Sequence, residues 1–350
     1  MSHEEITRRT LLEGAAVAGA AAVMSGSGRA DAAPAPDAAG PTSGADAGRK
    51  VALITGTSSG FGELIALTMA RAGDEVYAAM RDPHHRNRPA ARRLDRIARL
   101  ERLALEVVDI DVRSERSVAS GVRQVVRRAG RVDVLVNNAG IFYPALLETQ
   151  TIHQVREIFE TDVFGGLRMH RAVLPTMRHQ GEGLVVEITS GVGRIAFPFQ
   201  GAYNGAKWAM EALAQVTRYE LSQSGVDVVI VEPGAYPTDF IDNARVYYRE
   251  YLHDLSRSDA RRRREYGELA SRVEGELLEP TGPDPQQVAD AVERLVRTPA
   301  GRRPLRTLVG EQVEPLEEIN DVHQRIQDEI MHAAGYGDLI SVPSTSAHRG

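Results

Sequence analysis

The chain has 350 residues and no cysteine, which excludes disulfide frameworks, thiolate metal centres and cysteine nucleophiles. Its hydrophobic fraction of 42% is that of a globular protein, and a formal net charge of −6 at pH 7 gives no general attraction to nucleic acid or anionic membranes. Only Lys50 and Lys207 are lysines among 42 basic residues, so a lysine inside the fold requires a chemical reason.

The first 48 residues differ from the rest of the chain. Arg8-Arg9 precedes a short apolar run over 14–23, and Ala30-Asp31-Ala32 provides a small-residue cleavage site. Residues 1–32 therefore resemble a twin-arginine export signal leading to the periplasm or cell envelope, although Glu13 stands where a basic residue is usual. The alternative is a disordered alanine-rich tail on a cytoplasmic protein.

The remaining boundaries follow from composition. The apolar run over 14–23 is too short to span a bilayer, so no integral membrane span is expected. A flexible linker is expected over 33–48, one folded domain over 49–335 and a tail over 336–350.

Short aliphatic runs alternate with amphipathic stretches along the whole domain. The runs are continuous, as in strands buried on both faces, and lie at 51–54, 76–79, 105–108, 132–136, 184–188, 226–231 and 305–309. Helices are expected at 62–72, 90–103, 115–128, 152–179, 202–222 and 285–297. This alternation predicts an α/β fold with a Rossmann-type, doubly wound parallel sheet of about seven strands.

A glycine-rich loop, Thr55-Gly56-Thr57-Ser58-Ser59-Gly60-Phe61-Gly62, joins the first expected strand to the first helix. Glycines there allow a tight turn and a close approach of a pyrophosphate to the helix N-terminus, where free N–H groups favour anions. The loop is not a Walker motif, because no Gly-Lys-Ser/Thr follows. Its position between strand and helix indicates a dinucleotide site.

Tyr203 and Lys207 stand four residues apart, so on a helix they share one face. A free phenol has a pKa near 10, and a neighbouring ammonium stabilises the phenolate. The pair could therefore exchange a proton with a carbonyl or an alcohol. The alternative is an unremarkable surface pair on an amphipathic helix.

Several separately placed motifs together resemble the short-chain dehydrogenase/reductase family, in its single-domain branch, over about residues 50–310. Besides the glycine loop and Tyr203-x-x-x-Lys207, they are Asp111-Val112, Asn137-Asn138-Ala139-Gly140, Ser190 thirteen residues before Tyr203, and Pro233-Gly234 with Thr238. The resemblance implies an oxidoreductase that passes a hydride between a nicotinamide cofactor and a carbonyl or alcohol. It also implies a homo-oligomer, either a dimer or a tetramer.

The resemblance assigns roles to individual residues. Ser190 would hydrogen-bond the reacting oxygen, Tyr203 would transfer the proton, and Lys207 would hold the nicotinamide ribose. The implied cofactor-binding set is Thr55, Gly56, Ser58, Ser59, Gly60, Phe61, Gly62, Arg81, Asp111, Val112, Asn137, Ala139, Gly140, Tyr203, Lys207, Pro233, Gly234 and Thr238.

One family position departs from the pattern. Asp162 stands where the family has an asparagine that supports a water relay to the lysine. An ionised carboxylate can accept hydrogen bonds in such a relay but cannot donate them. It could also pair with Lys207 and weaken the effect of this lysine on Tyr203. We therefore count Asp162 among the catalytic candidates and expect an active enzyme with an altered pH profile.

Cofactor choice depends on the end of the second strand. The family's acidic residue for a ribose 2′-hydroxyl aligns with Met80, and Arg81 follows, a side chain suited to a 2′-phosphate. This favours NADP(H), with NAD(H) as the alternative if the strand ends two residues later and Asp82 takes the acidic role.

The segment 239–280 is expected to form a helical substrate lid, since it interrupts the strand pattern. Phe142, Phe199 and Phe240 are among the aromatics that suggest a hydrophobic ketone, aldehyde or secondary alcohol. No metal site is expected, because no His-x-x-x-His pattern occurs. The rival hypotheses are a catalytically silent dinucleotide-sensing protein and an epimerase or dehydratase of the longer-chain branch.

Overall fold

Seven parallel strands form a single sheet in the order β3-β2-β1-β4-β5-β6-β7 in the computed structural model, which describes residues 48–276, 282–311 and 313–341. The strands are β1 (Val51–Thr55), β2 (Glu75–Met80), β3 (Leu105–Asp109), β4 (Val134–Asn137), β5 (Gly183–Ile188), β6 (Val226–Pro233) and β7 (Arg306–Val309). The predicted doubly wound α/β fold is confirmed. The predicted export signal over 1–32 lies outside the described residues, as does the linker over 33–47.

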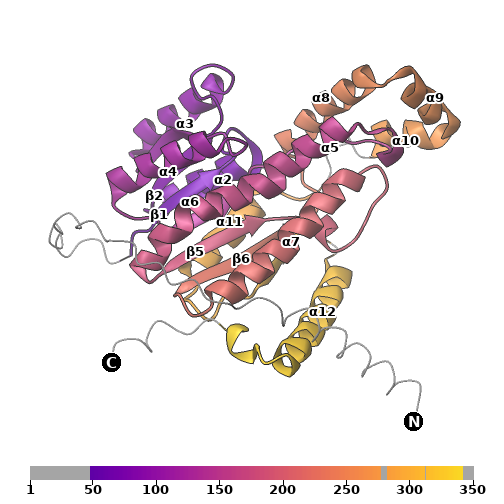
Figure 1. Ribbon diagram of the computed structural model, residues 1–350. Helices are drawn as coiled ribbons and strands as arrows, with labels where there is room; N and C mark the ends of the chain where they lie inside the picture. Colours follow the sequence, from indigo (N-terminus) through magenta and orange to yellow (C-terminus); the bar gives the residue numbers. More distant parts are fainter. Residues whose placement is uncertain (1–47, 277–281, 312, 342–350) are drawn as a thin grey trace, which may run out of the picture.

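Helices cover both faces of the sheet (Figure 1). One apolar core joins the sheet to α2 (Gly60–Arg71), α3 (Arg88–Glu101) and α11 (Gln286–Arg297). The other joins it to α4 (Glu115–Ala129), α6 (Phe164–Gln180) and α7 (Gly201–Leu221). Successive side chains of β1 alternate between the two cores, with Ala52 in the first and Leu53 in the second. Burial on both faces explains the continuous aliphatic runs of the sequence.

The strand order reverses between β1 and β4, and the loops after these two strands meet there. A side chain on Gly56 would lie 2.8 Å from Ala139 Cα. The Thr55 hydroxyl accepts N–H groups from Asn138 (3.0 Å) and Ala139 (3.1 Å). In sheets of this kind, ligands bind in the crevice at such a reversal, at the carboxyl ends of the strands.

The single helix predicted over 152–179 is interrupted. The structure divides it into α5 (Ile152–Ile158), a π-helical segment (Phe159–Val163) and α6. The Phe164 N–H bonds the Phe159 carbonyl, five residues back. Such a wide turn inserts a residue into a helix and often marks a functional site. Asp162 lies within it and is 2% exposed.

Three helices fill the segment predicted as a lid: α8 (Asp239–Asp254), α9 (Arg257–Glu265) and α10 (Glu268–Glu276). They extend from one end of the molecule (Figure 1). The buried Tyr251 hydroxyl of α8 lies 2.5 Å from the Thr149 hydroxyl, which fastens the segment to the body. Its role as a substrate lid stays a prediction.

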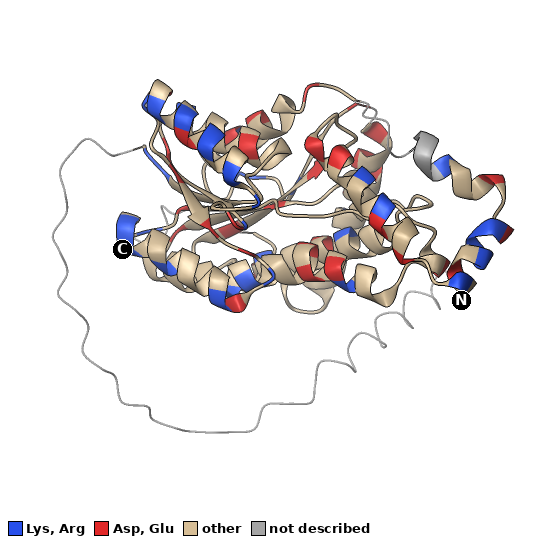
Figure 2. Ribbon diagram, turned by 90° about the horizontal axis from the view of Figure 1, so that it is seen from above, with Lys and Arg blue, Asp and Glu red and all other residues tan. Residues whose placement is uncertain are grey.

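Four consecutive arginines lie on α9, at 261–264, and two of them pair with acidic groups. Arg262 contacts Asp259 (2.8 Å) and Glu148 (3.6 Å), and Arg261 lies 3.8 Å from Glu265. Basic and acidic residues are interspersed over the outer helices (Figure 2). The pairing agrees with a solvated helix rather than a nucleic-acid surface.

A long C-terminal helix, α12 (Glu314–Ala333), follows β7 and was not predicted as an element. It lies apart from the helices of the two sheet layers (Figure 1). Within the described ranges, no helix is both long and apolar enough to cross a bilayer.

Candidate active site

Ser190, Tyr203 and Lys207 come together as the sequence predicted. Ser190 follows the carboxyl end of β5, and Tyr203 and Lys207 lie one turn apart on α7. The Lys207 amino group is buried, donates to the Ile188 carbonyl (3.2 Å) and lies 5.4 Å from the Tyr203 ring centroid. An interior lysine was expected to have a chemical reason, and this position beside a buried phenol provides one.

The ionisation of Tyr203 differs from the sequence-based expectation. We predicted that Lys207 would favour the phenolate, but burial and the Asp162 charge raise the pKa of Tyr203 above its ordinary value. The Ser190 hydroxyl acts in the opposite direction. Burial, which the spacing did not indicate, is the larger cause, and the Asp162 charge, which the sequence indicated as a partner of Lys207, adds to it.

Asp162 reaches Lys207 from the π-helical segment. Its Oδ2 lies 3.6 Å from Lys207 Nζ, and its Oδ1 accepts the Ile141 N–H at 2.9 Å. Oδ2 is buried and has no hydrogen-bond partner in the part of the chain that the structure describes. Burial raises the pKa of Asp162 to about 6, against the opposing effects of Lys207 and the Ile141 N–H. The site thus holds an acid that titrates near neutrality.

Aromatic rings surround the Tyr203 phenol. Its ring centroid lies 5.0 Å from that of Phe142 and 5.8 Å from that of Phe240 on α8. Phe142 and Phe240 are stacked on each other, with an interplanar angle of 10°. Tyr203 is only 9% exposed. The reacting end of the site is therefore apolar and largely shielded from water.

The glycine loop forms the expected turn into α2. Gly60 has a φ of +59°, and a side chain on Gly62 would lie 2.3 Å from the Gly56 carbonyl oxygen. Ser59 caps α2 without a side-chain hydrogen bond, which leaves the first N–H groups of the helix available to an anion. These features fit the pyrophosphate of a dinucleotide.

Three of the predicted cofactor residues have internal roles. Thr55 is 2% exposed and joins the ends of β1 and β4. The Asn137 amide donates to the Glu187 carboxylate (2.6 Å), which also bonds His170 Nε2 (2.6 Å). Val112 packs where a side chain on Gly165 would lie, at 2.9 Å. The side chains of these residues support the site from within.

Other predicted cofactor residues lie at the carboxyl ends of β1, β3, β4 and β6. The Asp111 carboxylate is part-exposed and accepts the Arg113 N–H at 3.0 Å. Phe61 packs edge-to-face on Tyr236 (5.4 Å), and a side chain on Gly60 would lie 3.7 Å from Thr238. The remaining members of this set are Ser58, Ala139, Gly140, Pro233 and Gly234, which lie in the same loops at the ends of β1, β4 and β6.

Arg81 and Asp82, the two candidates for cofactor choice, follow the end of β2. The strand ends at Met80, as the first alternative required. Asp82 has a φ of 50°, donates its N–H to Asp109 (3.1 Å) and accepts the Arg86 N–H (3.1 Å). One oxygen of its carboxylate, Oδ2, thus stabilises a turn. Burial raises the pKa of Tyr247 on α8. The charges of Arg81 and Arg86 lower it, which indicates that both guanidinium groups are close enough to α8 to interact with this phenol.

Two residues near the glycine loop were missed by sequence reasoning. Thr57 donates its hydroxyl to the Ala79 carbonyl (3.1 Å). Arg93 of α3 donates to the Ser58 carbonyl (3.1 Å) and to Glu63 on α2 (2.7 Å). No local signal in the sequence announces either contact, because each joins residues more than twenty positions apart.

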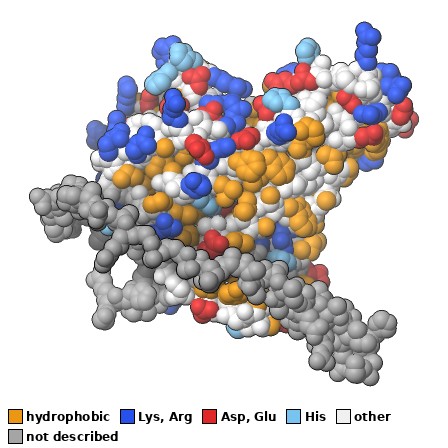
Figure 3. Space-filling model, in the orientation of Figure 1, with side chains coloured by type: hydrophobic (Ala, Val, Ile, Leu, Met, Phe, Trp, Pro, Cys, Tyr) orange, Lys and Arg blue, Asp and Glu red, His pale blue; other side chains and the backbone are white. Residues whose placement is uncertain are grey.

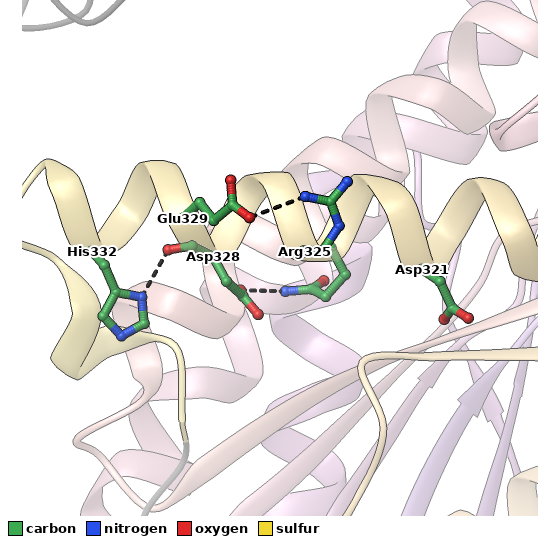
Figure 4. A pocket seen from close by; sticks show the side chains of 6 residues that line it. Asp321, Arg325, Asp328, Glu329 and His332 are labelled. Atoms are coloured by element: carbon green, nitrogen blue, oxygen red, sulfur yellow. Dashed lines mark hydrogen bonds and ion pairs between the residues drawn. The ribbon is translucent and has the colours of Figure 1, made fainter. Parts of the chain in front are cut away.

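A hollow on α12 does not belong to this site. Its lining residues all come from α12, where they bond mainly one another, as in the Arg325–Glu329 pair at 3.0 Å (Figure 4). None of the predicted site residues lines it. Among the described residues there is also no cluster of three or more metal-ligating side chains.

Comparison with known proteins agrees with the geometry. The family model for short chain dehydrogenase matches residues 50–247. A 3-ketodihydrosphingosine reductase of Bacteroides thetaiotaomicron is 34% identical over 197 residues, covering 56% of this chain and 68% of its own. Retinol dehydrogenase 8 of Bos taurus is 31% identical over 282 residues, covering 78% of this chain and 85% of its own.

Solved structures give the same result. A short-chain dehydrogenase from Streptomyces avermitilis matches with a TM-score of 0.64 and 30% identity, covering 83% of this chain and 98% of that one. An alcohol dehydrogenase from Thermococcus sibiricus, complexed with 5-hydroxy-NADP, matches with a TM-score of 0.59 and 27% identity, covering 75% and 97%. The chain therefore belongs to the short-chain dehydrogenase family of oxidoreductases.

Proposed function

We propose that the protein is an NADP(H)-dependent reductase or dehydrogenase acting on a hydrophobic ketone, aldehyde or secondary alcohol. The observation that carries this proposal is the buried Tyr203 phenol, which has Ser190 and Lys207 beside it and the rings of Phe142 and Phe240 around it. A polar reacting group enclosed by aromatic rings suits a carbonyl on an apolar skeleton. The names of the reductase and retinol dehydrogenase relatives support the same substrate class.

The cofactor proposal depends on the end of β2. Arg81 directly follows the strand, whereas Asp82 lies one residue further on and uses one carboxylate oxygen in its own turn. A guanidinium binds a phosphate through paired hydrogen bonds, which favours NADP(H) over NAD(H). The 5-hydroxy-NADP complex of the Thermococcus sibiricus relative supports this assignment.

The chain's own residues would divide the chemistry as follows. When bound, the nicotinamide cofactor gives or accepts the hydride. Ser190 holds the substrate oxygen, and Tyr203 gives its phenolic proton to that oxygen in reduction or removes it in oxidation. Lys207 places a positive charge beside the phenol, and Asp162 sets how strongly that charge is felt. The aromatic rings keep water away from the reacting carbon.

The rival hypothesis is a dinucleotide-sensing protein without turnover. Such a protein has no need of the complete Ser190, Tyr203 and Lys207 set, so their assembly argues against it. The deciding experiment follows absorbance at 340 nm with NADPH or NADH and a panel of hydrophobic carbonyls. We expect turnover with a preference for NADPH. The Tyr203→Phe variant should still bind NADPH but lose most of this turnover. NADPH binding without turnover of any carbonyl would favour the sensor.

We further propose a homo-oligomer joined through α6 and α7. Exposed apolar side chains gather over these helices (Figure 3), among them Phe164 (43% exposed), Trp208 (48%) and Val216 (50%). Contiguous apolar surface of this kind commonly marks a subunit interface.

We also propose export by the twin-arginine route, which carries folded proteins and so suits an enzyme that binds its cofactor before transport.

A further inference from the structure

A buried polar network borders the loop that carries Ser190. It joins Glu211 of α7, Glu232 of β6 and Arg306 of β7, which are all nearly or completely buried. Arg306 Nε donates to Glu211 (2.9 Å) and lies 3.6 Å from Glu232, and its Nη2 donates to Gln215 (2.9 Å). The Glu211 carboxylate also accepts the hydroxyl of Thr189, the neighbour of Ser190, at 2.6 Å.

The C-terminal helix α12 contributes one buried polar residue to this network. Asn320 is 9% exposed, and its side chain bonds in two directions. Its amide Nδ2 donates to Glu232 Oε2 at 2.6 Å, and its Oδ1 accepts from Arg194 Nε at 2.8 Å. One turn earlier, Leu316 packs against Gly191, since a side chain on that glycine would lie 2.9 Å from Leu316 Cδ1.

The two partners of Asn320 belong to the two segments that hold Ser190. Arg194 follows the short helix η3 (Gly191–Gly193), which begins immediately after Ser190. Glu232 precedes Pro233, whose carbonyl accepts the Ser190 hydroxyl at 3.4 Å. A single amide therefore bridges the segment that carries the catalytic hydroxyl and the segment that orients it.

We propose that Asn320 is a positioning residue for Ser190, through which α12 completes the active site. This inference rests on the proposed oxidoreductase function. An amide suits both partners here, because its Nδ2 donates to the Glu232 carboxylate while its Oδ1 accepts from the Arg194 guanidinium. Without it, the buried Glu232 carboxyl loses one hydrogen bond, and the two segments beside Ser190 lose the connection that Asn320 makes between them.

The electrostatics around Glu232 make the substitution Asn320→Asp informative. Burial and Glu211 raise the pKa of Glu232, while Asn320, Arg306 and Arg194 oppose them. His323 of α12 also lies near these arginines, whose charges and burial lower its pKa. An aspartate at position 320 would bring a second carboxylate to Glu232, so the pair would share a proton at low pH and repel at high pH.

The test measures kcat and KM for Asn320→Ala and Asn320→Asp, each alone and combined with Ser190→Ala, with Asp321→Asn as the control on the exposed neighbour. We expect Asn320→Ala to lower kcat about tenfold while the KM for NADPH changes less than about twofold, because the residue orients the hydroxyl and does not touch the dinucleotide. In the Ser190→Ala background the same substitution should cost nothing further. Asn320→Asp should regain activity as the pH falls and its shared proton restores the bridge, whereas Asn320→Ala should not.

The outcomes separate this inference from the proposed function. If wild type reduces no carbonyl, the proposed function fails. If wild type is active but Asn320→Ala leaves kcat unchanged, or costs as much with Ser190→Ala as without it, the positioning role is refuted. A uniform loss at every pH in Asn320→Asp would also refute it. Should Asn320→Ala fold poorly in thermal unfolding, the pH-dependent recovery of Asn320→Asp still decides.

Discussion

Replacing Asp162 with asparagine should move the pH dependence of catalysis to lower pH. The substitution keeps the size of the side chain but removes the charge that faces Lys207 at 3.6 Å. In wild type this carboxyl has a pKa raised to about 6 by burial, and its charged form raises the pKa of Tyr203. Above about pH 6, the wild-type phenol is therefore held in its neutral form more strongly than it would be beside Lys207 alone.

The size of the effect follows from two distances. The 3.6 Å from Asp162 to Lys207 and the 5.4 Å from Lys207 to the Tyr203 ring place the carboxylate at most about 9 Å from the ring centroid. At an effective dielectric constant of about 20, a unit charge at about 9 Å changes the free energy of ionisation by about 1.8 kcal/mol, or about 1.3 pKa units. The pKa of Tyr203 should fall by roughly this amount in Asp162→Asn.

The assay is kcat/KM for alcohol oxidation between pH 5 and 10, where the logarithm of the rate rises with pH because the small phenolate fraction grows even below the pKa of Tyr203. Asp162→Asn should shift that rise to lower pH by about one unit and abolish any inflection near pH 6. Glu160→Gln is the matched control, since it removes a carboxylate of the same π-helical segment that is partly exposed and paired with Arg168. Superimposable profiles for wild type and Asp162→Asn would refute the reasoning.

Three further predictions follow from the proposed function. Arg81→Ala should raise the KM for NADPH by about tenfold or more and leave that for NADH nearly unchanged, as measured by initial rates; equal effects on both would contradict a phosphate contact. Trp208→Glu should dissociate the oligomer in light scattering, and a wild type that is already monomeric would remove the basis for that interface. Arg8→Lys/Arg9→Lys should keep the protein in the cytoplasm upon fractionation, and a wild type found wholly there and unprocessed would exclude export.

The strands could be predicted closely because the sheet is buried on both faces. Each strand is a short aliphatic run bounded by polar residues. Because burial on both faces requires such a run, the strand can be recognised from the sequence. β2 is an example, because its end at Met80 lies directly before Arg81, the residue on which the NADP(H) proposal rests. The motifs of the site were equally visible, since Tyr203 and Lys207 are four residues apart on one helix and Ser190 precedes Tyr203 by thirteen residues.

The π-helical segment could not be predicted in this way. A single inserted residue leaves the apolar periodicity of 152–179 almost unchanged, yet it determines the direction in which Asp162 points. The raised pKa of Tyr203 was missed for a related reason. It depends mainly on the burial of Tyr203, which is not visible from the four-residue spacing to Lys207, and less on Asp162, which the sequence did indicate.

The contribution of α12 depends on contacts that are remote in sequence. Asn320 bonds Glu232 and Arg194 across 88 and 126 residues, and a lone asparagine on an acidic helix gives no local indication of either partner. The motif-based assignment therefore found the reacting groups but not the residue proposed to orient one of them.

The geometry of α7 links these two levels. Tyr203, Lys207, Glu211 and Gln215 follow one another at intervals of four residues, so they lie along one face of the helix. The first two reach the site, while the last two bond Arg306 at the edge of the sheet. A rotation or slide of α7 that displaced Tyr203 would also break the buried ion pair of Glu211, which is costly because it leaves an uncompensated charge. The network beside Ser190 thus also fixes the position of α7, the helix that carries Tyr203 and Lys207. For that reason Ser190 and Tyr203 keep their positions relative to each other.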